Sequence, residues 1–183
     1  MTNKDRFEAG WLVAARHCPS PNFDELPQRP ELIVIHCISL PPKEYGGDWI
    51  QRLFLNQIEG DEHPSFASLQ GVRVSAHFYI DRNGTLTQFV PINKRAWHAG
   101  QSSYLGRENC NDFSLGIELE GDDESSYSDA QYDTLSNLVN VLLNEVPTLS
   151  ADRIAAHSEI APGRKTDPGP GFDWSRFRKG LNA

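Results

Sequence analysis

The segment 31–39, ELIVIHCIS, limits the possible folds more than any other stretch, because β-branched and other apolar residues follow one another through most of it. Such a run is typical of a buried β-strand. The segment LPPKEYGG directly after it contains two prolines and ends the strand. Residues 111–121 alternate apolar and polar side chains, which predicts a second strand with one apolar face, formed by Phe113, Leu115, Ile117 and Leu119.

Signals for helices alternate with those for strands. Residues 48–58 have helical spacing, and a shorter helix is predicted near residues 7–16. Ser128 and Gln131 form a capping-box pattern, which predicts the start of a helix. Asp173 is placed to cap a final helix.

Further strands complete the pattern. VSAHFYI and TLTQFV flank a turn that contains Asn83 and Gly84, which predicts a hairpin, and RIAAH predicts a short strand that ends at His157. This order predicts one α/β domain with a mixed central β-sheet and helices packed on its faces. We expect the domain to cover residues 1–183, with residues 1–30 as an N-terminal extension packed on it.

Composition excludes several classes of protein. The net charge of −8 argues against a nucleic-acid partner, because such proteins neutralise phosphates with Lys and Arg. No stretch approaches a membrane span, and residues 1–30 lack an apolar signal segment, so we expect no membrane partner. Cys18, Cys37 and Cys110 are an odd number without close pairing, which predicts reduced thiols and a cytoplasmic location.

A proline-rich segment near the C-terminus, HSEIAPGRKTDPGPGFDW, carries His157, Lys165 and Asp167 close together. Catalytic zinc takes three protein ligands and leaves a position for water. His36 and His157, each at a predicted strand, could bind zinc together with Asp167. The spacing leaves His17, His63 and His98 open as alternative ligands.

Two carboxylates mark the polar face of the strand at 111–121. Glu118 and Glu120 lie two residues apart, so both side chains project from the same face. This face could line a cleft, could simply be solvated, or could carry a glycosidase pair about 6–7 Å apart. Lys165, two residues before Asp167, could stabilise an oxyanion near a metal. Cys37 should point away from His36, which argues against Cys37 as a ligand.

Five segments together resemble the AmpD-type 1,6-anhydro-N-acetylmuramyl-L-alanine amidases, which belong to a zinc amidase superfamily shared with phage amidases and peptidoglycan recognition proteins. The segments are VIHCISLPPKEYGG, RVSAHFYIDRNG, KRAWHAG, CNDFSLGIELEG and HSEIAPGRKTDPGPGFDW. The resemblance covers nearly the whole chain in order. It implies one zinc ion bound by His36, His157 and Asp167, with Glu118 and Lys165 as catalytic residues.

Substrate contacts are also expected. Arg73, Arg107 and Arg164 could pair with carboxylates of a stem peptide. The resemblance implies that Trp97 and His98 flank the sugar. Further candidates for substrate contacts are His77, Cys37 and Asn109; at the last two positions, relatives carry other residues.

The resemblance implies hydrolysis of the amide between the lactyl group of anhydro-muramic acid and L-alanine. The enzyme would be a cytoplasmic monomer in peptidoglycan recycling, and would thereby limit β-lactamase induction. Two alternatives stay open: a protein that binds peptidoglycan fragments without cleaving them, and a metal-independent glycosidase that uses Glu118 and Glu120.

Overall fold

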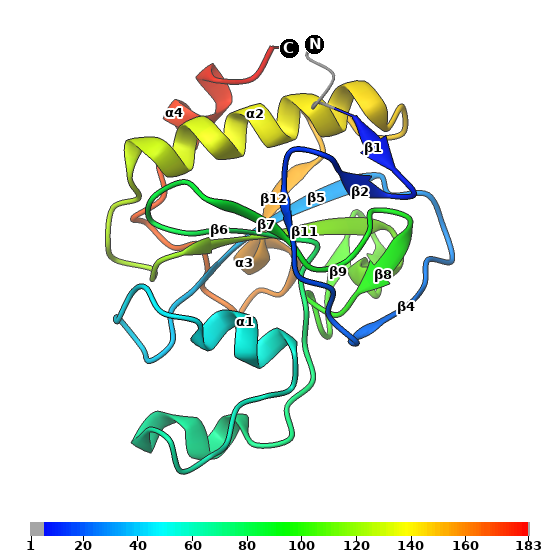
Figure 1. Ribbon diagram of the computed structural model, residues 1–183. Coiled ribbons are helices and arrows are strands. Elements are labelled where there is room, and N and C mark those ends of the chain that lie inside the picture. Colours follow the sequence, from blue (N-terminus) through cyan, green and yellow to red (C-terminus); the bar gives the residue numbers. More distant parts are fainter. Residues whose placement is uncertain (1–5, 183) are drawn as a thin grey trace.

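The computed structural model describes residues 6–182 and is built around a six-stranded mixed sheet (Figure 1). At its centre, β5 (Leu32–Ile38) and β11 (Ser114–Glu120) run parallel, with His36 opposite Glu118. The strand order is β12-β5-β11-β6-β7-β3, with β12 at Ile154–Ala156, β6 at Phe78–Ile80, β7 at Leu86–Gln88 and β3 at Arg16–His17. The predicted α/β fold with a mixed central sheet is confirmed.

One face of the sheet is covered by the long helix α2 (Asp129–Glu145), as Figure 1 shows. Ser128 caps this helix, and Gln131 completes the predicted capping box. The main core lies between α2 and the sheet, where the apolar face of β11 packs against Leu135, Leu138 and Leu142. The final helix α4 (Trp174–Lys179) packs on α2, and Asp173 caps it as predicted.

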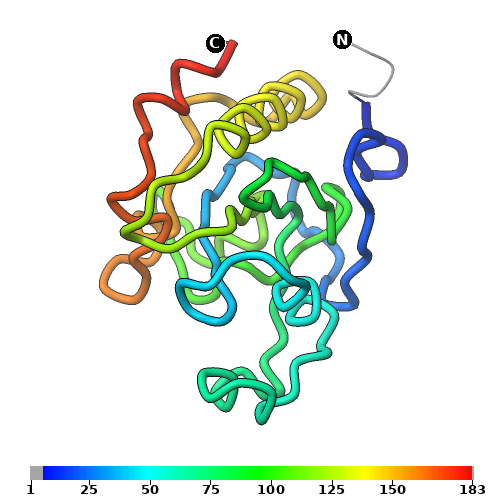
Figure 2. The backbone as a smooth tube through the Cα atoms, turned by 60° about the vertical axis from the view of Figure 1, so that its left-hand side comes forward, coloured from blue at the N-terminus to red at the C-terminus, as the bar shows by residue number. Residues whose placement is uncertain are grey.

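The opposite face carries short elements and loops. The helix α1 (Trp49–Phe54) is shorter than the predicted 48–58, and the 3₁₀ helix η1 (Pro64–Leu69) follows it in a segment that projects from the body of the molecule (Figure 2). The remaining elements here are β4 (Phe23–Glu25), β8 (Lys94–Ala96), β9 (Ser103–Tyr104), β10 (Arg107–Glu108), η2 (Cys110–Asp112) and α3 (His157–Ile160). Both faces of β5 and β11 are therefore covered, which explains why β5 is almost continuously apolar.

The predicted helix near residues 7–16 is wrong. The chain instead forms a hairpin of β1 (Phe7–Glu8) and β2 (Trp11–Leu12), joined by Ala9 and Gly10. Both loop residues have positive φ, 49° and 86°, as the favoured two-residue hairpin turn requires. The prediction of an extension over residues 1–30 includes residues 1–5, which lie outside the described part. Within residues 6–182, no helix is both long and apolar enough to span a bilayer.

Candidate metal centre and active site

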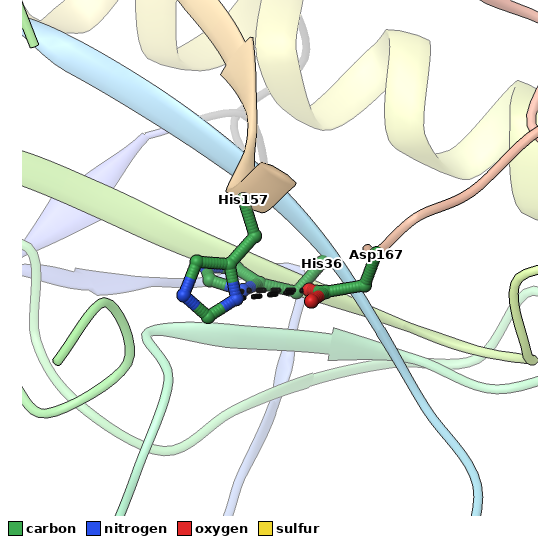
Figure 3. Close-up of side chains that lie close together, drawn as sticks. All are labelled: His36, His157 and Asp167. Atoms are coloured by element: carbon green, nitrogen blue, oxygen red, sulfur yellow. Dashed lines mark hydrogen bonds and ion pairs between the residues drawn. The ribbon is translucent and has the colours of Figure 1, made fainter. Parts of the chain in front are cut away.

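Three side chains from distant parts of the chain converge on one point (Figure 3). His36 comes from β5, His157 is the first residue of α3, and Asp167 lies in the following loop. His36 Nδ1 and His157 Nδ1 are 2.9 Å apart, and Asp167 Oδ2 is 3.2 Å and 3.0 Å from them respectively. Both histidines are almost completely buried.

The fold explains this convergence. The strands β12 and β5 are parallel neighbours, so the residue that follows β12 lies beside the carboxyl-terminal half of β5. The backbone amide of Ser158 donates a hydrogen bond to the Asp167 carbonyl, which draws the proline-rich loop back over the two histidines.

The donor set fits a divalent cation. The Nε2 atom of His157 is 3.1 Å from the carbonyl oxygen of Ala99, which can only accept, so Nε2 carries the proton. In the neutral tautomer with this proton, Nδ1 carries a lone pair and lies 3.0 Å from the Asp167 carboxylate. A cation between these two electron-rich atoms would satisfy both of them. Burial also lowers the pKa of His36 to about 4, which keeps its ring neutral. This group can therefore bind a metal ion.

Glu118 lies beside this group, opposite His36 in the register of the sheet. Its Oε2 atom is buried and has no hydrogen-bond partner among the described residues. Burial raises the pKa of Glu118 well above its ordinary value; the nearby Asp167 raises it further and Lys165 opposes the shift. A buried carboxyl group with an unpaired oxygen is able to exchange protons with a bound molecule.

A cleft of about 680 Å³ opens next to the group. Lys165 is exposed and lines it together with Asp167 and Arg164. Cys37 also lines the cleft, and it packs toward the core under α2, on the opposite face of β5 from His36, as predicted. Burial raises the pKa of the Cys37 thiol, so the thiol stays protonated at neutral pH.

Glu120 projects from the same face as Glu118, as predicted, but both oxygens of its carboxylate are hydrogen-bonded within the protein. Its two oxygens accept hydrogen bonds from the backbone amides of Gly46, at 2.5 Å, and Arg82, at 2.9 Å. This arrangement fixes two loops to the end of β11 and argues against the glycosidase alternative, which needs both carboxylates.

Two histidines predicted to contact substrate lie in the interior. His77 is fully buried; its Nε2 donates to the Lys94 carbonyl and its Nδ1 accepts from the Gly116 amide. His98 is 9% exposed and lies behind His36. Their burial argues against the predicted substrate contacts.

The other predicted residues are spread around the site. Arg107 donates hydrogen bonds to Glu31 and Gln28, and its guanidinium covers the ring of Phe113. These contacts hold the guanidinium outside the cleft. Asn109 lines a separate cavity of about 350 Å³ that shares Arg164 with the cleft.

Trp97 is partly exposed, and its Nε1 atom donates to Asp24. Arg73 is exposed and forms no ion pair within residues 6–182. The alternative ligands His17 and His63 bond to Leu12 and Ser65 and lie outside the metal-binding group.

The fold and this group define an α/β protein with a potential metal centre beside a carboxyl group that has an unpaired oxygen. A family model described as N-acetylmuramoyl-L-alanine amidase matches residues 26–170, and the chain belongs to that family. The prediction that it is an amidase of the AmpD type is thereby confirmed.

The relatives agree with this assignment. The 1,6-anhydro-N-acetylmuramyl-L-alanine amidase AmpD of Salmonella typhimurium is 55% identical over 173 residues, which cover 93% of this chain and 92% of that protein. The AmpD of Escherichia coli is 54% identical over 93% of this chain and 94% of its own length.

Solved structures give the same result. The crystal structure of a selenomethionine derivative of AmpD superposes with a TM-score of 0.93 at 53% identity, covering 96% of this chain and 99% of that one. E. coli AmiD in complex with anhydro-N-acetylmuramic acid-L-Ala-D-γ-Glu-L-Lys gives 0.60 at 27% identity, over 84% of this chain and 58% of that one.

Proposed function

We propose that this amidase uses zinc to hydrolyse the amide bond between the lactyl group of 1,6-anhydro-N-acetylmuramic acid and the L-alanine of muropeptides. The main support is the convergence of His36, His157 and Asp167 beside the unpaired oxygen of Glu118. The names of the AmpD relatives, and the peptide bound to AmiD, support the choice of substrate.

In this proposal His36, His157 and Asp167 hold the zinc ion. Two imidazoles and a carboxylate are a donor set of the kind found in catalytic zinc sites, which keep one position open. Zinc, when bound, would lower the pKa of water to about 7 and polarise the scissile carbonyl.

Glu118 carries the proton. Its Oε2 accepts a proton from the attacking water and returns it to the leaving amine nitrogen, because an amide anion is a poor leaving group. The buried position of Glu118 suits this role, since burial raises the pKa of the carboxyl group and lets it hold a proton more readily than an exposed glutamate. The ammonium group of Lys165, at the rim of the cleft, stabilises the oxyanion that develops on the carbonyl oxygen.

The remaining parts of the substrate would lie in the cleft and over the surface around it. Arg73 and Arg164 are proposed partners for stem-peptide carboxylates, and Cys37, Trp97 and Asn109 stay candidates for contacts to the substrate. We place the enzyme in the cytoplasm as a monomer in peptidoglycan recycling. By removing anhydro-muropeptides, it would limit β-lactamase induction.

The proposal is tested by mass-spectrometric turnover of anhydro-muramyl-tripeptide. Purified protein is assayed as prepared, after chelation and after zinc is restored, with Asp167→Ala as a control that cannot complete the ligand set. We expect release of free tripeptide that is lost on chelation and recovered with zinc in the wild type only. No release from zinc-loaded protein, or release that chelation leaves unchanged, would contradict the proposal.

A further inference from the structure

His98 lies behind the metal-binding group, on the side of His36 that faces away from Asp167. Its Nδ1 atom is 2.9 Å from His36 Nε2, whereas His36 Nδ1 faces His157 and Asp167. One proton therefore lies between the two rings. The ring that carries this proton determines which nitrogen of His36 keeps a lone pair to bind a cation.

The contacts of Ser114 determine the direction of this hydrogen bond. Ser114 Oγ is 2.6 Å from the carbonyl oxygen of Cys110, which can only accept, so the hydroxyl proton lies on that line. Oγ must then accept from His98 Nε2, 3.2 Å away. A neutral His98 with its proton on Nε2 has a lone pair on Nδ1, and this lone pair accepts the Nε2 proton of His36.

The neighbouring residue orients the second histidine of the group. The carbonyl oxygen of Ala99 accepts the Nε2 proton of His157. Both residues are fixed by Asn111, whose Oδ1 atom accepts hydrogen bonds from the backbone amides of His98, at 3.1 Å, and Ala99, at 2.8 Å. Residues 98 and 99 thus direct the Nδ1 atoms of both histidines toward the same point.

Gly116 provides the space for the His98 ring. This residue lies on β11, on the face that also carries Glu118. A Cβ atom at this position would lie 2.4 Å from Cγ of His98, far inside van der Waals contact. The ring therefore packs directly on the backbone of β11, which restricts its rotation.

We propose that His98 is a positioning residue of the metal centre: it accepts the Nε2 proton of His36 and thereby fixes Nδ1 as the atom that binds the metal. This inference rests on the zinc site of the proposed function. Hydrogen-bond partners of metal-binding histidines typically change metal affinity by about 10- to 100-fold when they are removed.

The variant His98→Phe tests this role, because it keeps a ring against Gly116 but cannot accept the proton. We expect its dissociation constant for zinc, measured by competition with a coloured chelator, to rise by about 10- to 100-fold. His98→Gln has a side-chain oxygen that can accept the proton. Its zinc affinity should therefore lie between that of the wild type and that of His98→Phe. Wild-type affinity in a folded His98→Phe would overturn the inference, whereas a wild-type protein that binds no zinc would refute the metal site itself.

His77→Phe is the matched control. His77 is also a buried ring, 5.9 Å from His98 between centroids, but both of its nitrogens bond to the backbone. We expect it to lower the melting temperature and leave zinc affinity unchanged. If it weakens zinc binding as much as His98→Phe, the effect is general loosening and the inference is wrong.

Ring-nitrogen NMR of the zinc-loaded wild type gives a test that depends on no variant. The proposed hydrogen bonds from His36 to His98 and from His98 to Ser114 require a proton on Nε2 of both histidines. They also require that Nδ1 of His98 is unprotonated. A proton on Nδ1 of His98 would overturn the inference.

Discussion

Glu118 combines a proposed catalytic role with an unfavourable position for a charge. The residue as a whole is partly buried, but its Oε2 atom is fully buried and has no hydrogen-bond partner among the described residues. We expect Glu118→Gln to reduce kcat by about 100- to 10,000-fold, the usual range for loss of a general acid–base group, with zinc affinity retained. Near-normal turnover in the folded variant would contradict the proton-transfer role.

The same substitution should stabilise the metal-free protein at high pH. Because the folded-state pKa of Glu118 lies above the unfolded value, its contribution to stability is present at low pH and is lost as the pH rises through the folded-state pKa. In chelator, the melting temperature of Glu118→Gln should therefore exceed that of wild type by a margin that grows from pH 5 to pH 9. A difference in melting temperature that stays the same from pH 5 to pH 9 would contradict a raised pKa of Glu118 in the folded protein.

Glu120→Gln is the control for that measurement, since it removes a carboxylate two residues away on the same face. This carboxylate accepts two backbone amides, so we expect its loss to lower the melting temperature.

The direction of a side chain could be predicted from sequence on a strand, but not in irregular structure. The alternation in 111–121 has a period of two, which correctly placed Glu118 and Glu120 on one face. Trp97 and His98 follow β8 without a repeating pattern, so nothing in the sequence showed that His98 lies behind His36. Ser114 accepts a hydrogen bond from His98, and Gly116 leaves space for its ring. Neither role could be predicted, because each depends on a side chain that is distant in the sequence.

At the level of elements, the capping box of α2 should contribute measurably to stability. Ser128 accepts a hydrogen bond from the Gln131 amide, and its hydroxyl also donates to the Arg82 carbonyl at 2.8 Å. We expect Ser128→Ala to reduce the free energy of unfolding by about 1 kcal/mol, and the melting temperature by about 2–4 °C.

The exposed Ser150, whose side chain forms no hydrogen bond in the described part of the chain, gives the control variant Ser150→Ala. Zinc affinity should be unchanged in both variants, because α2 covers the face of the sheet opposite the metal-binding group. Equal melting temperatures for the two variants would contradict the role of the cap.

Elements with strong local signals could be predicted, and those that depend on backbone conformation could not. The cap of α2 and the apolar run of β5 are encoded in neighbouring residues. The segment 7–16 has apolar residues compatible with a helix, but positive φ at Ala9 and Gly10 turns it into a hairpin. Gly10, which readily adopts positive φ, was the available signal for that turn.

At the level of the whole molecule, zinc should raise the stability of the fold, because the ligands belong to three separate segments. At a zinc concentration 100 times the dissociation constant, mass action contributes about 2.7 kcal/mol, or about 5–11 °C in melting temperature. Thermal melts with zinc and with chelator should show this difference in wild type. Asp167→Ala should show little of it, and a wild type unaffected by zinc would contradict the site.

The fold class could be predicted because strands and helices alternate along the chain. The order of strands could not, since the parallel pairing of β12 with β5 and of β5 with β11 joins residues far apart in sequence. The metal-binding group depends on these pairings. The residue types made His36, His157 and Asp167 candidates among several, the resemblance selected these three, and only the fold shows that they lie together.

His36 and His157, the two proposed metal ligands, are 121 positions apart along the chain, which has a consequence for how the enzyme matures. Helices such as α2 form from local contacts, whereas parallel pairing of distant strands is slow. A refolding chain should therefore regain its circular-dichroism signal for helix before it regains zinc binding and activity. Hydrolysis then begins only in chains that have completed the central sheet, so an unfinished chain is inactive while it folds.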